Sequence, residues 1–204
     1  MGALPGQDGR RRCPWAGSTA EYQAYHDDEW GRPVVDDVRL YEKLCLEGFQ
    51  SGLSWLTILR KRPGFRQAFA GFEPEKVAAF DEGDVARLLG DAGIVRHRGK
   101  IEAAIANAAA TLAVQADRGS LAALVWEFEP ARQGRALPVR LGDLPPQTAE
   151  TKALSKALRR YGFRFIGPTT AYAAMQSLGL VNDHLKGCHV RAACEDERRR
   201  LTGV

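Results

Sequence analysis

The sequence predicts an all-α protein, and three observations support this fold class. The middle of the chain is rich in alanine and poor in β-branched residues, and its apolar residues recur at helical spacing. No segment shows the regular alternation of apolar and polar residues that a half-buried strand requires. No internal repeat of roughly 20–50 residues is present, which excludes a solenoid.

The length and composition favour one soluble domain. The chain has 204 residues, of which 45% are hydrophobic and 26% charged, a mixture typical of a globular protein with a real core. The net charge of +4 favours an acidic partner such as nucleic acid without proving one. No apolar stretch approaches the roughly 20 residues of a membrane helix. Because the N-terminus also lacks the apolar core of a signal peptide, we expect a cytoplasmic, monomeric protein with no membrane partner.

We expect three regions along the chain. Residues 1–12 should form a disordered basic extension, residues 13–190 a single domain, and residues 191–204 a charged tail with solvated arginines. The four cysteines are more consistent with reduced thiols or a metal site than with disulfides, because no export signal precedes them.

The first helices are predicted from caps and periodicity. Ser18 and Glu21 have the spacing of a capping box, so a helix should begin near Thr19. Residues 36–55 follow acidic cap candidates and should form one helix, because apolar side chains recur on one face. These side chains are Val38, Tyr41, Leu44 and Cys45.

Further helices fill the middle of the chain. Residues 74–80 and 83–94 are predicted as short helices, the second closed by Gly93. Residues 99–117 form the longest periodic run, which ends at Gly119, and residues 121–128 follow as another helix. Prolines and glycines without periodicity then predict a loop over residues 129–150.

A helix, a glycine-bracketed turn and a second helix are predicted over residues 151–179. Gly162 and Gly167 bracket the turn, and Pro168 occupies a favoured first helical position. Such a turn can direct backbone N–H groups and a helix dipole at a phosphate. The surrounding positive charge comes from Lys152, Lys156, Arg159, Arg160 and Arg164. A plain helix–turn–helix corner with a glycine cap explains the same pattern, so the residues alone leave both interpretations open.

Two possible metal ligands lie four residues apart in "NDHLKGC", His184 and Cys188. Cys13 and His26 would complete a closed Cys₂His₂ tetrahedron, the type of site that holds structural zinc rather than copper or iron. The alternative is two unrelated pairs of buried residues. Cys45 fits a core position on an apolar helix face, and Cys194 should be a free thiol in the charged tail.

Several motifs together resemble the bacterial 3-methyladenine DNA glycosylase I family. They are "RCPW", "YHDDEWG", "CLEGFQSGLSW", "DAGIVRHRGKI", "LSKALRRYGFRFIGPTTAYAAMQ" and "GLVNDH", and they follow one another from about residue 12 to about residue 190. The resemblance implies a helix-hairpin-helix glycosylase fold, with the hairpin at 161–167. It also implies that Cys13, His26, His184 and Cys188 bind one structural zinc ion that joins the two ends of the chain.

The resemblance implies functional residues position by position. Glu47 matches the family's pocket carboxylate and is the expected catalytic residue, while Trp55 and Tyr25 match aromatic walls of the base pocket. Trp30 and Tyr22 are further base-binding candidates. The expected contacts to the DNA backbone are Gly162, Arg164, Gly167 and Thr169. Phe49 and Ser51 depart from the polar or small residues expected beside Glu47, which puts the shape of the pocket rim in doubt.

These residue types suit the excision of a cationic base from double-stranded DNA. 3-Methyladenine in DNA carries a delocalised positive charge, so its bond to the sugar is already weak. Aromatic faces attract such a ring by roughly 0.5–2 kcal/mol, and a carboxylate accepts hydrogen bonds from its exocyclic amine. Because Thr169 lies where a Schiff-base lysine would be, and Asn182 where an aspartate would be, we expect a glycosylase that does not cleave the strand.

Two other functions fit parts of the sequence. A zinc-stapled helical module that binds DNA or damaged bases without excision would share the hairpin and the metal. It would differ in its need for Glu47. A zinc hydrolase fits less well, because four protein ligands leave no open position for water.

Overall fold

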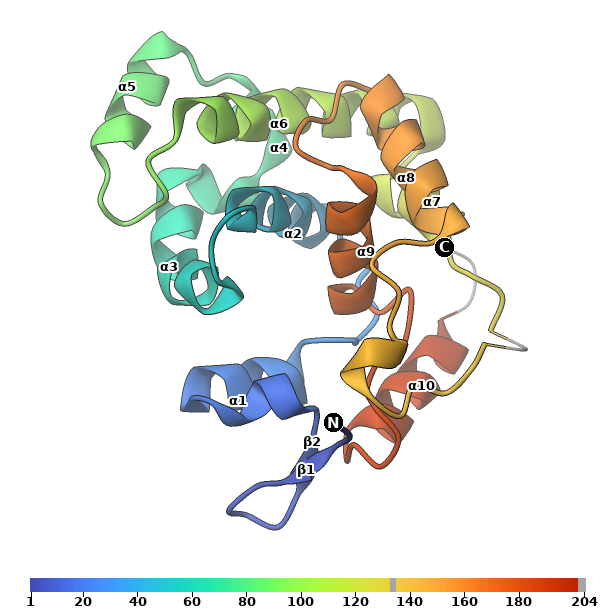
Figure 1. Cartoon of the computed structure of the whole chain (residues 1–204). Coiled ribbons are helices and arrows are strands. Elements are labelled where there is room, and N and C mark those ends of the chain that lie inside the picture. Colours follow the sequence, from blue (N-terminus) through green and yellow to red (C-terminus); the bar gives the residue numbers. More distant parts are fainter. Residues whose placement is uncertain (133–134, 202–204) are drawn as a thin grey trace.

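The computed structural model describes residues 1–132 and 135–201, and it consists mainly of helices (Figure 1). The strands and α-helices in chain order are β1 (Leu4–Pro5), β2 (Arg11–Arg12), α1 (Ala20–Asp28), α2 (Asp37–Gln50), α3 (Trp55–Ala68), α4 (Pro74–Ala78), α5 (Glu82–Gly90), α6 (Arg98–Arg118), α7 (Leu121–Trp126), α8 (Ala149–Arg160), α9 (Pro168–Ser177) and α10 (Arg191–Arg200). Short 3₁₀ turns are η1 (Pro14–Gly17), η2 (Ala70–Phe72) and η3 (Leu141–Asp143). Within the described ranges, no helix combines the length and apolarity needed to cross a membrane.

Helix α2 lies at the centre of the main hydrophobic core. Its side chains between Leu40 and Phe49 are almost all buried, and it packs against α3, α6, α7 and α9. A helix covered on nearly all faces belongs in the interior of a domain. Cys45 packs in this core, as predicted. Glu47 is carried on the same helix and is thereby withdrawn from bulk water.

The predicted helix over residues 36–55 is divided into α2 and the start of α3. The chain turns at Gly52, whose φ of +82° favours glycine, and Ser54 then caps α3 by accepting a hydrogen bond from the Thr57 N–H. Helix α3 beyond Trp55 lies outside the predicted helices. It contains Pro63, which ordinarily disfavours a helix interior and thus hides this element from a pattern-based prediction.

The N-terminal residues are folded, in contrast to the expected disordered extension. Strands β1 and β2 form a short antiparallel hairpin. Arg12 is buried between two carboxylates, donating hydrogen bonds to Asp8 and Asp27 at 2.7–3.0 Å. Because both carboxylates compensate its charge, this arginine can leave water. Ala3 packs with the buried residues around Cys13 and Cys188.

The C-terminal segment also differs from the expected solvated tail, because residues 191–200 form α10. Arg198 is 5% exposed and donates hydrogen bonds to Glu129 and to the Leu180 carbonyl. Cys194 is a free thiol, as predicted, but it is buried rather than exposed, and burial raises its pKa to about 11. Figure 1 shows α10, the β1–β2 hairpin and α1 at the end of the molecule opposite α5.

The predicted helix–turn–helix segment is present as α8 and α9. Gly162 has a φ of +102°, which requires glycine, whereas Gly167 has an ordinary φ of −78° and serves as the N-cap of α9 with Pro168 in the first turn. Asn107 of α6 fixes the turn, since its side chain accepts a hydrogen bond from the Arg164 N–H and donates one to the Arg164 carbonyl.

Candidate active site and metal centre

Four predicted metal ligands meet at one buried point. Cys13 precedes η1, His26 lies in the last turn of α1, and His184 and Cys188 come from the loop before α10. The four ligand atoms all lie within 4.8 Å of one another. The sulfur of Cys188 lies 3.4 Å from His26 Nε2 and 3.5 Å from His184 Nδ1, and Cys13 Sγ lies 3.8 Å from His184 Nδ1. The group could therefore hold a single metal ion.

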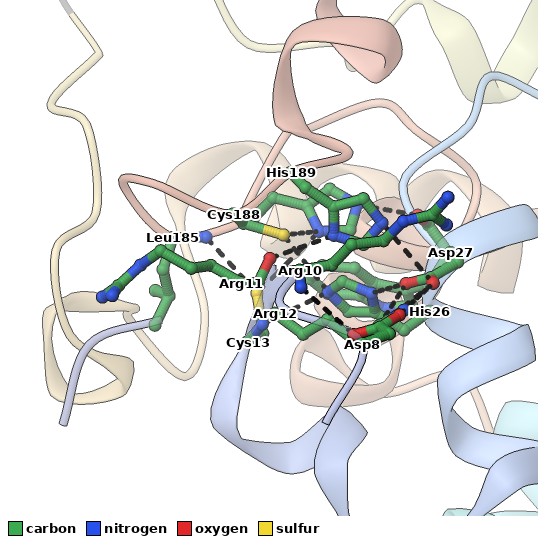
Figure 2. Close-up of polar contacts among 12 residues, drawn as sticks. Asp8, Arg10, Arg11, Arg12, Cys13, His26, Asp27, Leu185, Cys188 and His189 are labelled. Carbon is green, nitrogen blue, oxygen red and sulfur yellow. Dashed lines mark hydrogen bonds and ion pairs between the residues drawn. The ribbon is translucent and has the colours of Figure 1, made fainter. Parts of the chain in front are cut away.

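The outer nitrogens of both histidines are held by further groups. His26 Nδ1 lies 2.8 Å from the carboxylate of Asp27, which in turn accepts hydrogen bonds from Arg12 (Figure 2). His184 Nε2 lies 2.9 Å from the carbonyl oxygen of Trp30. Such contacts fix the ring orientation and leave one nitrogen of each ring directed at the metal position. Burial also lowers the pKa of His184, which favours the neutral imidazole that a metal requires.

The two thiols of this group are electrostatically linked. The hydrogen bond between them lowers the pKa of Cys188 well below its ordinary value and raises that of Cys13. The backbone N–H of Leu185 also donates to Cys13 Sγ at 3.4 Å. The polar groups around both sulfurs therefore suit negative charge at this position.

A cavity of about 340 Å³ lies beside this group and contains all five predicted base-binding residues. Helix α1 contributes Tyr22 and Tyr25, α2 contributes Glu47, α3 begins with Trp55, and Trp30 follows α1. Tyr25 and Trp55 face each other with ring centroids 5.5 Å apart. The cavity has the size of a small-molecule site, and five of its eleven lining residues are aromatic.

The cavity also includes residues that were not among the predicted site residues. Trp15 packs edge-on against Tyr22 and Trp30, with centroids at 5.7 and 5.1 Å. Trp15 follows Cys13 by two residues in "RCPW", one of the motifs that carry the family resemblance, so the sequence contained a signal for this wall residue. Among the other wall residues, Gln50 of α2 and Ala173 and Gln176 of α9 also lie within motifs that carry the family resemblance. Leu141 and Leu144, in the loop before α8, lie outside those motifs.

The four clustered residues Cys13, His26, His184 and Cys188 (the metal group) contact two aromatic walls of the cavity directly. The Trp30 ring lies edge-on to His184 with centroids 4.7 Å apart, and the Trp15 ring lies 5.2 Å from that of His26. The Trp30 carbonyl oxygen also accepts a hydrogen bond from His184 Nε2. Two pocket walls are therefore positioned by residues of the metal group.

Glu47 is a buried carboxylate with a cationic neighbour. It is 6% exposed, and burial raises its pKa, while the nearby Lys43 ammonium opposes this rise. Lys43 Nζ lies 3.7 Å from Glu47 Oε1. Burial in turn lowers the pKa of Lys43 to about 8, against the influence of Glu47. Each of these two groups therefore shifts the pKa of the other in the direction that favours its charged form.

The two departures beside Glu47 do not reshape the cavity. Phe49 is 1% exposed and packs against Phe65 and Phe69 in the core, with centroids at 4.6 and 5.9 Å. Ser51 is exposed at the turn after α2. Neither residue lines the pocket.

The four expected DNA-backbone residues lie together at the α8–α9 hairpin, outside the cavity. Gly162, Arg164 and Thr169 are exposed, and Gly167 is half-buried. The hairpin approaches the pocket helix closely, because a Cβ added at Gly48 would lie only 3.3 Å from that of Phe165. Asn182, by contrast, is 3% exposed and donates hydrogen bonds to Arg191 and Glu195, away from the aromatic walls.

Comparison with known proteins identifies relatives of the whole domain. Residues 15–192 match the model of the methyladenine glycosylase family. DNA-3-methyladenine glycosylase 1 of Escherichia coli (strain K12) is 48% identical over 177 residues, which cover 87% of this chain and 95% of that protein. A crystal structure of 3-methyladenine DNA glycosylase I, 47% identical, superposes with a TM-score of 0.84 over 87% of this chain and 98% of its own. A structure explaining 3-methyladenine recognition by the Staphylococcus aureus enzyme is 36% identical, with a TM-score of 0.84 over 88% and 96%.

Proposed function

The chain belongs to the methyladenine glycosylase family, and on this premise we propose that it excises 3-methyladenine from alkylated DNA by hydrolysing the N-glycosidic bond. The observation that carries this proposal is the convergence of Tyr22, Tyr25, Trp30, Glu47 and Trp55 on one cavity. A base extruded from the helix would enter this cavity, stack on the aromatic rings and place its exocyclic amine near the buried carboxylate.

The chemical step needs little acid catalysis from the protein. The bonding pair of the C1′–N9 bond leaves with the base, which thereby loses its positive charge, and the sugar becomes an oxocarbenium ion. A water oxygen then bonds to C1′ and releases a proton, leaving an abasic site. The aromatic rings and Glu47 bind the cationic base, and Glu47 can stabilise the positive sugar that forms next to it.

The test of this function is chromatography of the bases that the purified protein releases from methylated DNA. We expect release of 3-methyladenine while 7-methylguanine stays in the DNA. Release of neither base by folded protein would instead favour the binding module that recognises damage without excision. Release of both would show a broader substrate range than the family resemblance implies.

We also propose that the enzyme is monofunctional. Thr169 stands at the exposed start of α9, where a Schiff-base lysine is expected in strand-cleaving relatives of this fold, and Asn182 is held away from the cavity. Asp183 is 1% exposed, and its carboxylate accepts hydrogen bonds from Tyr172, Gln176 and Arg135. This carboxylate is therefore suited to position the wall residue Gln176. Borohydride trapping of a protein–DNA adduct would contradict the monofunctional assignment.

For the metal group we propose one structural zinc ion. Zinc–sulfur and zinc–nitrogen bonds of about 2.3 and 2.05 Å in a tetrahedron place sulfur and nitrogen about 3.6 Å apart. The observed sulfur–nitrogen distances of 3.4–3.8 Å match this value. Two thiolates and two imidazoles fill all four positions, so Cys13, His26, His184 and Cys188 would hold the ion without leaving a place for substrate. When bound, the ion supplies stability rather than chemistry.

We further propose that a monomer binds double-stranded DNA through the α8–α9 hairpin. The exposed turn at Gly162 has no side chain to block a phosphate, and the exposed Arg164 side chain offers it positive charge. The same segment contacts α2 beside Glu47 through Phe165 and Gly48, so a strand held at the hairpin lies near the pocket helix. The base that enters the cavity would come from this strand.

A further inference from the structure

A cation lies directly behind three residues that line the base pocket, in the adjacent cavity on the other side of Tyr25. Lys43 lies one turn before Glu47 on α2, with its ammonium 3.9 Å from the Trp55 ring centroid and 4.6 Å from that of Tyr25. It donates a hydrogen bond to the Tyr25 hydroxyl and lies 3.7 Å from Glu47 Oε1. The three groups expected to attract a cationic base therefore already face a positive charge that is 12% exposed.

The other charged groups near Lys43 are paired with one another or screened by solvent. Glu29, after α1, pairs with Arg62 of α3, and Glu42 of α2 pairs with Arg66 of α3. Arg39 of α2 is exposed and contributes little through solvent. Tyr25 and Glu47 are the remaining titratable groups that face the ammonium, and α9 presents only Ser177. Lys43 is thus the counter-ion of Glu47.

We propose that Lys43 is a specificity-determining residue that makes the pocket favour a neutral base over a cationic one. This inference rests on the proposed excision of 3-methyladenine. Because the ammonium compensates Glu47 and faces the same two rings, positive charge on the bound base gains less from the pocket. A unit charge within about 5 Å, at an effective dielectric constant of about 20, changes a binding constant by more than about tenfold.

The same charge assists the reaction. As the C1′–N9 bond breaks, its electron pair moves to N9, so the base loses its positive charge and the sugar gains it. The positive charge therefore moves from the buried base toward the sugar and away from Lys43. The repulsion between Lys43 and the cationic base weakens binding of the substrate. Because this repulsion decreases as the charge moves to the sugar, it lowers the barrier to bond cleavage.

Two free ligands separate these effects from DNA binding. 3-Methyladenine is neutral at neutral pH, whereas 3,9-dimethyladeninium has nearly the same shape and carries a positive charge. Their binding can be followed by quenching of the fluorescence of the pocket tryptophans, in wild type and in Lys43→Met. Lys76→Met, which removes an exposed lysine of α4, is the matched control.

We expect wild type and Lys76→Met to bind the neutral ligand more tightly than the cation. In Lys43→Met this ratio should shift toward the cation by about tenfold or more. Single-turnover excision should become slower in Lys43→Met while methylated DNA binds more tightly. An unchanged ratio of the two affinities overturns the proposal, and an unchanged excision rate overturns its catalytic part.

Failure of the underlying function gives a different result. If neither ligand binds wild type, the cavity is not the base pocket, and the inference fails together with it.

A measurement on wild type alone covers the case in which Lys43→Met does not fold. Burial lowers the pKa of Lys43 to about 8, so its ammonium loses its charge as pH increases through this value. The affinity for the cationic ligand should therefore rise relative to the affinity for the neutral ligand. A flat ratio across this range overturns the proposal.

Discussion

Glu47 owes its chemical character to its position on a fully packed helix. Burial raises its pKa, and the adjacent Lys43 opposes this rise. A carboxyl group whose pKa is raised on folding contributes stability at low pH and loses it as pH rises through the folded value. The ionised form of Glu47, which we propose recognises the base, is therefore maintained at a cost to stability that Lys43 reduces. At the residue scale, the pocket depends on this pair.

We expect Glu47→Gln to lower the rate of 3-methyladenine release by about 10²–10³-fold, because a neutral amide cannot balance the positive charge on the sugar. Released base is quantified by chromatography under single-turnover conditions. Binding to undamaged DNA, measured by fluorescence anisotropy, should stay close to that of wild type, because Glu47 lies in the cavity rather than on the hairpin. A variant that excises at the wild-type rate would remove Glu47 from the reaction.

Among the elements, the turn after α1 carries an unusual steric demand. Gly31 has a φ of +84°, and a Cβ at this position would lie 2.9 Å from Nε2 of His184, one of the four proposed metal ligands. Because Gly31 has no Cβ, the His184 ring has room to lie 2.9 Å from the Trp30 carbonyl oxygen. The turn thus joins α1, a pocket wall and the metal group.

Gly31→Ala should destabilise the protein by about 2 kcal/mol or more, since it combines backbone strain with displacement of His184. Urea denaturation monitored by circular dichroism gives the free energy of unfolding. Gly17→Ala is the matched control, because its added Cβ meets no atom within 4 Å. Equal stability of the two variants would show that the turn tolerates a side chain.

The α8–α9 hairpin is the element expected to hold the DNA backbone. Arg164→Ala should weaken binding to all DNA sequences alike and reduce the slope of log affinity against log salt concentration by about 1, as loss of one phosphate contact does. Arg87→Ala, on the distant helix α5, should leave the slope unchanged. Titrations by fluorescence anisotropy at several salt concentrations provide the slopes. An unaltered slope in Arg164→Ala would exclude this contact.

For the whole molecule, the metal group closes the chain on itself. It connects Cys13 near the N-terminus with Cys188 near the C-terminus, and it packs directly under Trp15 and Trp30 of the pocket. Binding energy of a metal at such a site contributes to folding, because the site does not exist in the unfolded chain. The proposed zinc ion would therefore couple the stability of the fold to the support of two pocket walls.

Removal of the metal should lower the free energy of unfolding by at least about 3 kcal/mol and reduce excision, because two aromatic walls lose their support. Thermal unfolding and base release are measured before chelation, after chelation and after zinc is returned, alongside elemental analysis of the purified protein. Both properties should recover with zinc. Full activity of a metal-free, chelator-treated protein would separate the cluster from the pocket.

Several parts of this molecule follow from local physics and are therefore predictable from the sequence. The long helix over residues 99–117 appears as α6 and ends at Gly119, because periodicity and a glycine stop are short-range signals. The four ligand residues and the aromatic candidates are recognisable by type and by the motifs around them. Their convergence at two adjacent sites agrees with the resemblance that the motifs carry.

Other features depend on contacts between distant segments, which no local pattern contains. The division of α2 from α3 aims Glu47 and Trp55 at one cavity. The β1–β2 hairpin and α10 are packed on the domain because buried partners bind Arg12 and Arg198. The sequence by itself determined most of the helices between α1 and α9, the metal-binding residue types and the family. Only the tertiary structure decided that Lys43 faces Glu47 and that Trp15 joins the pocket, because burial and charge compensation arise only when separate helices pack together.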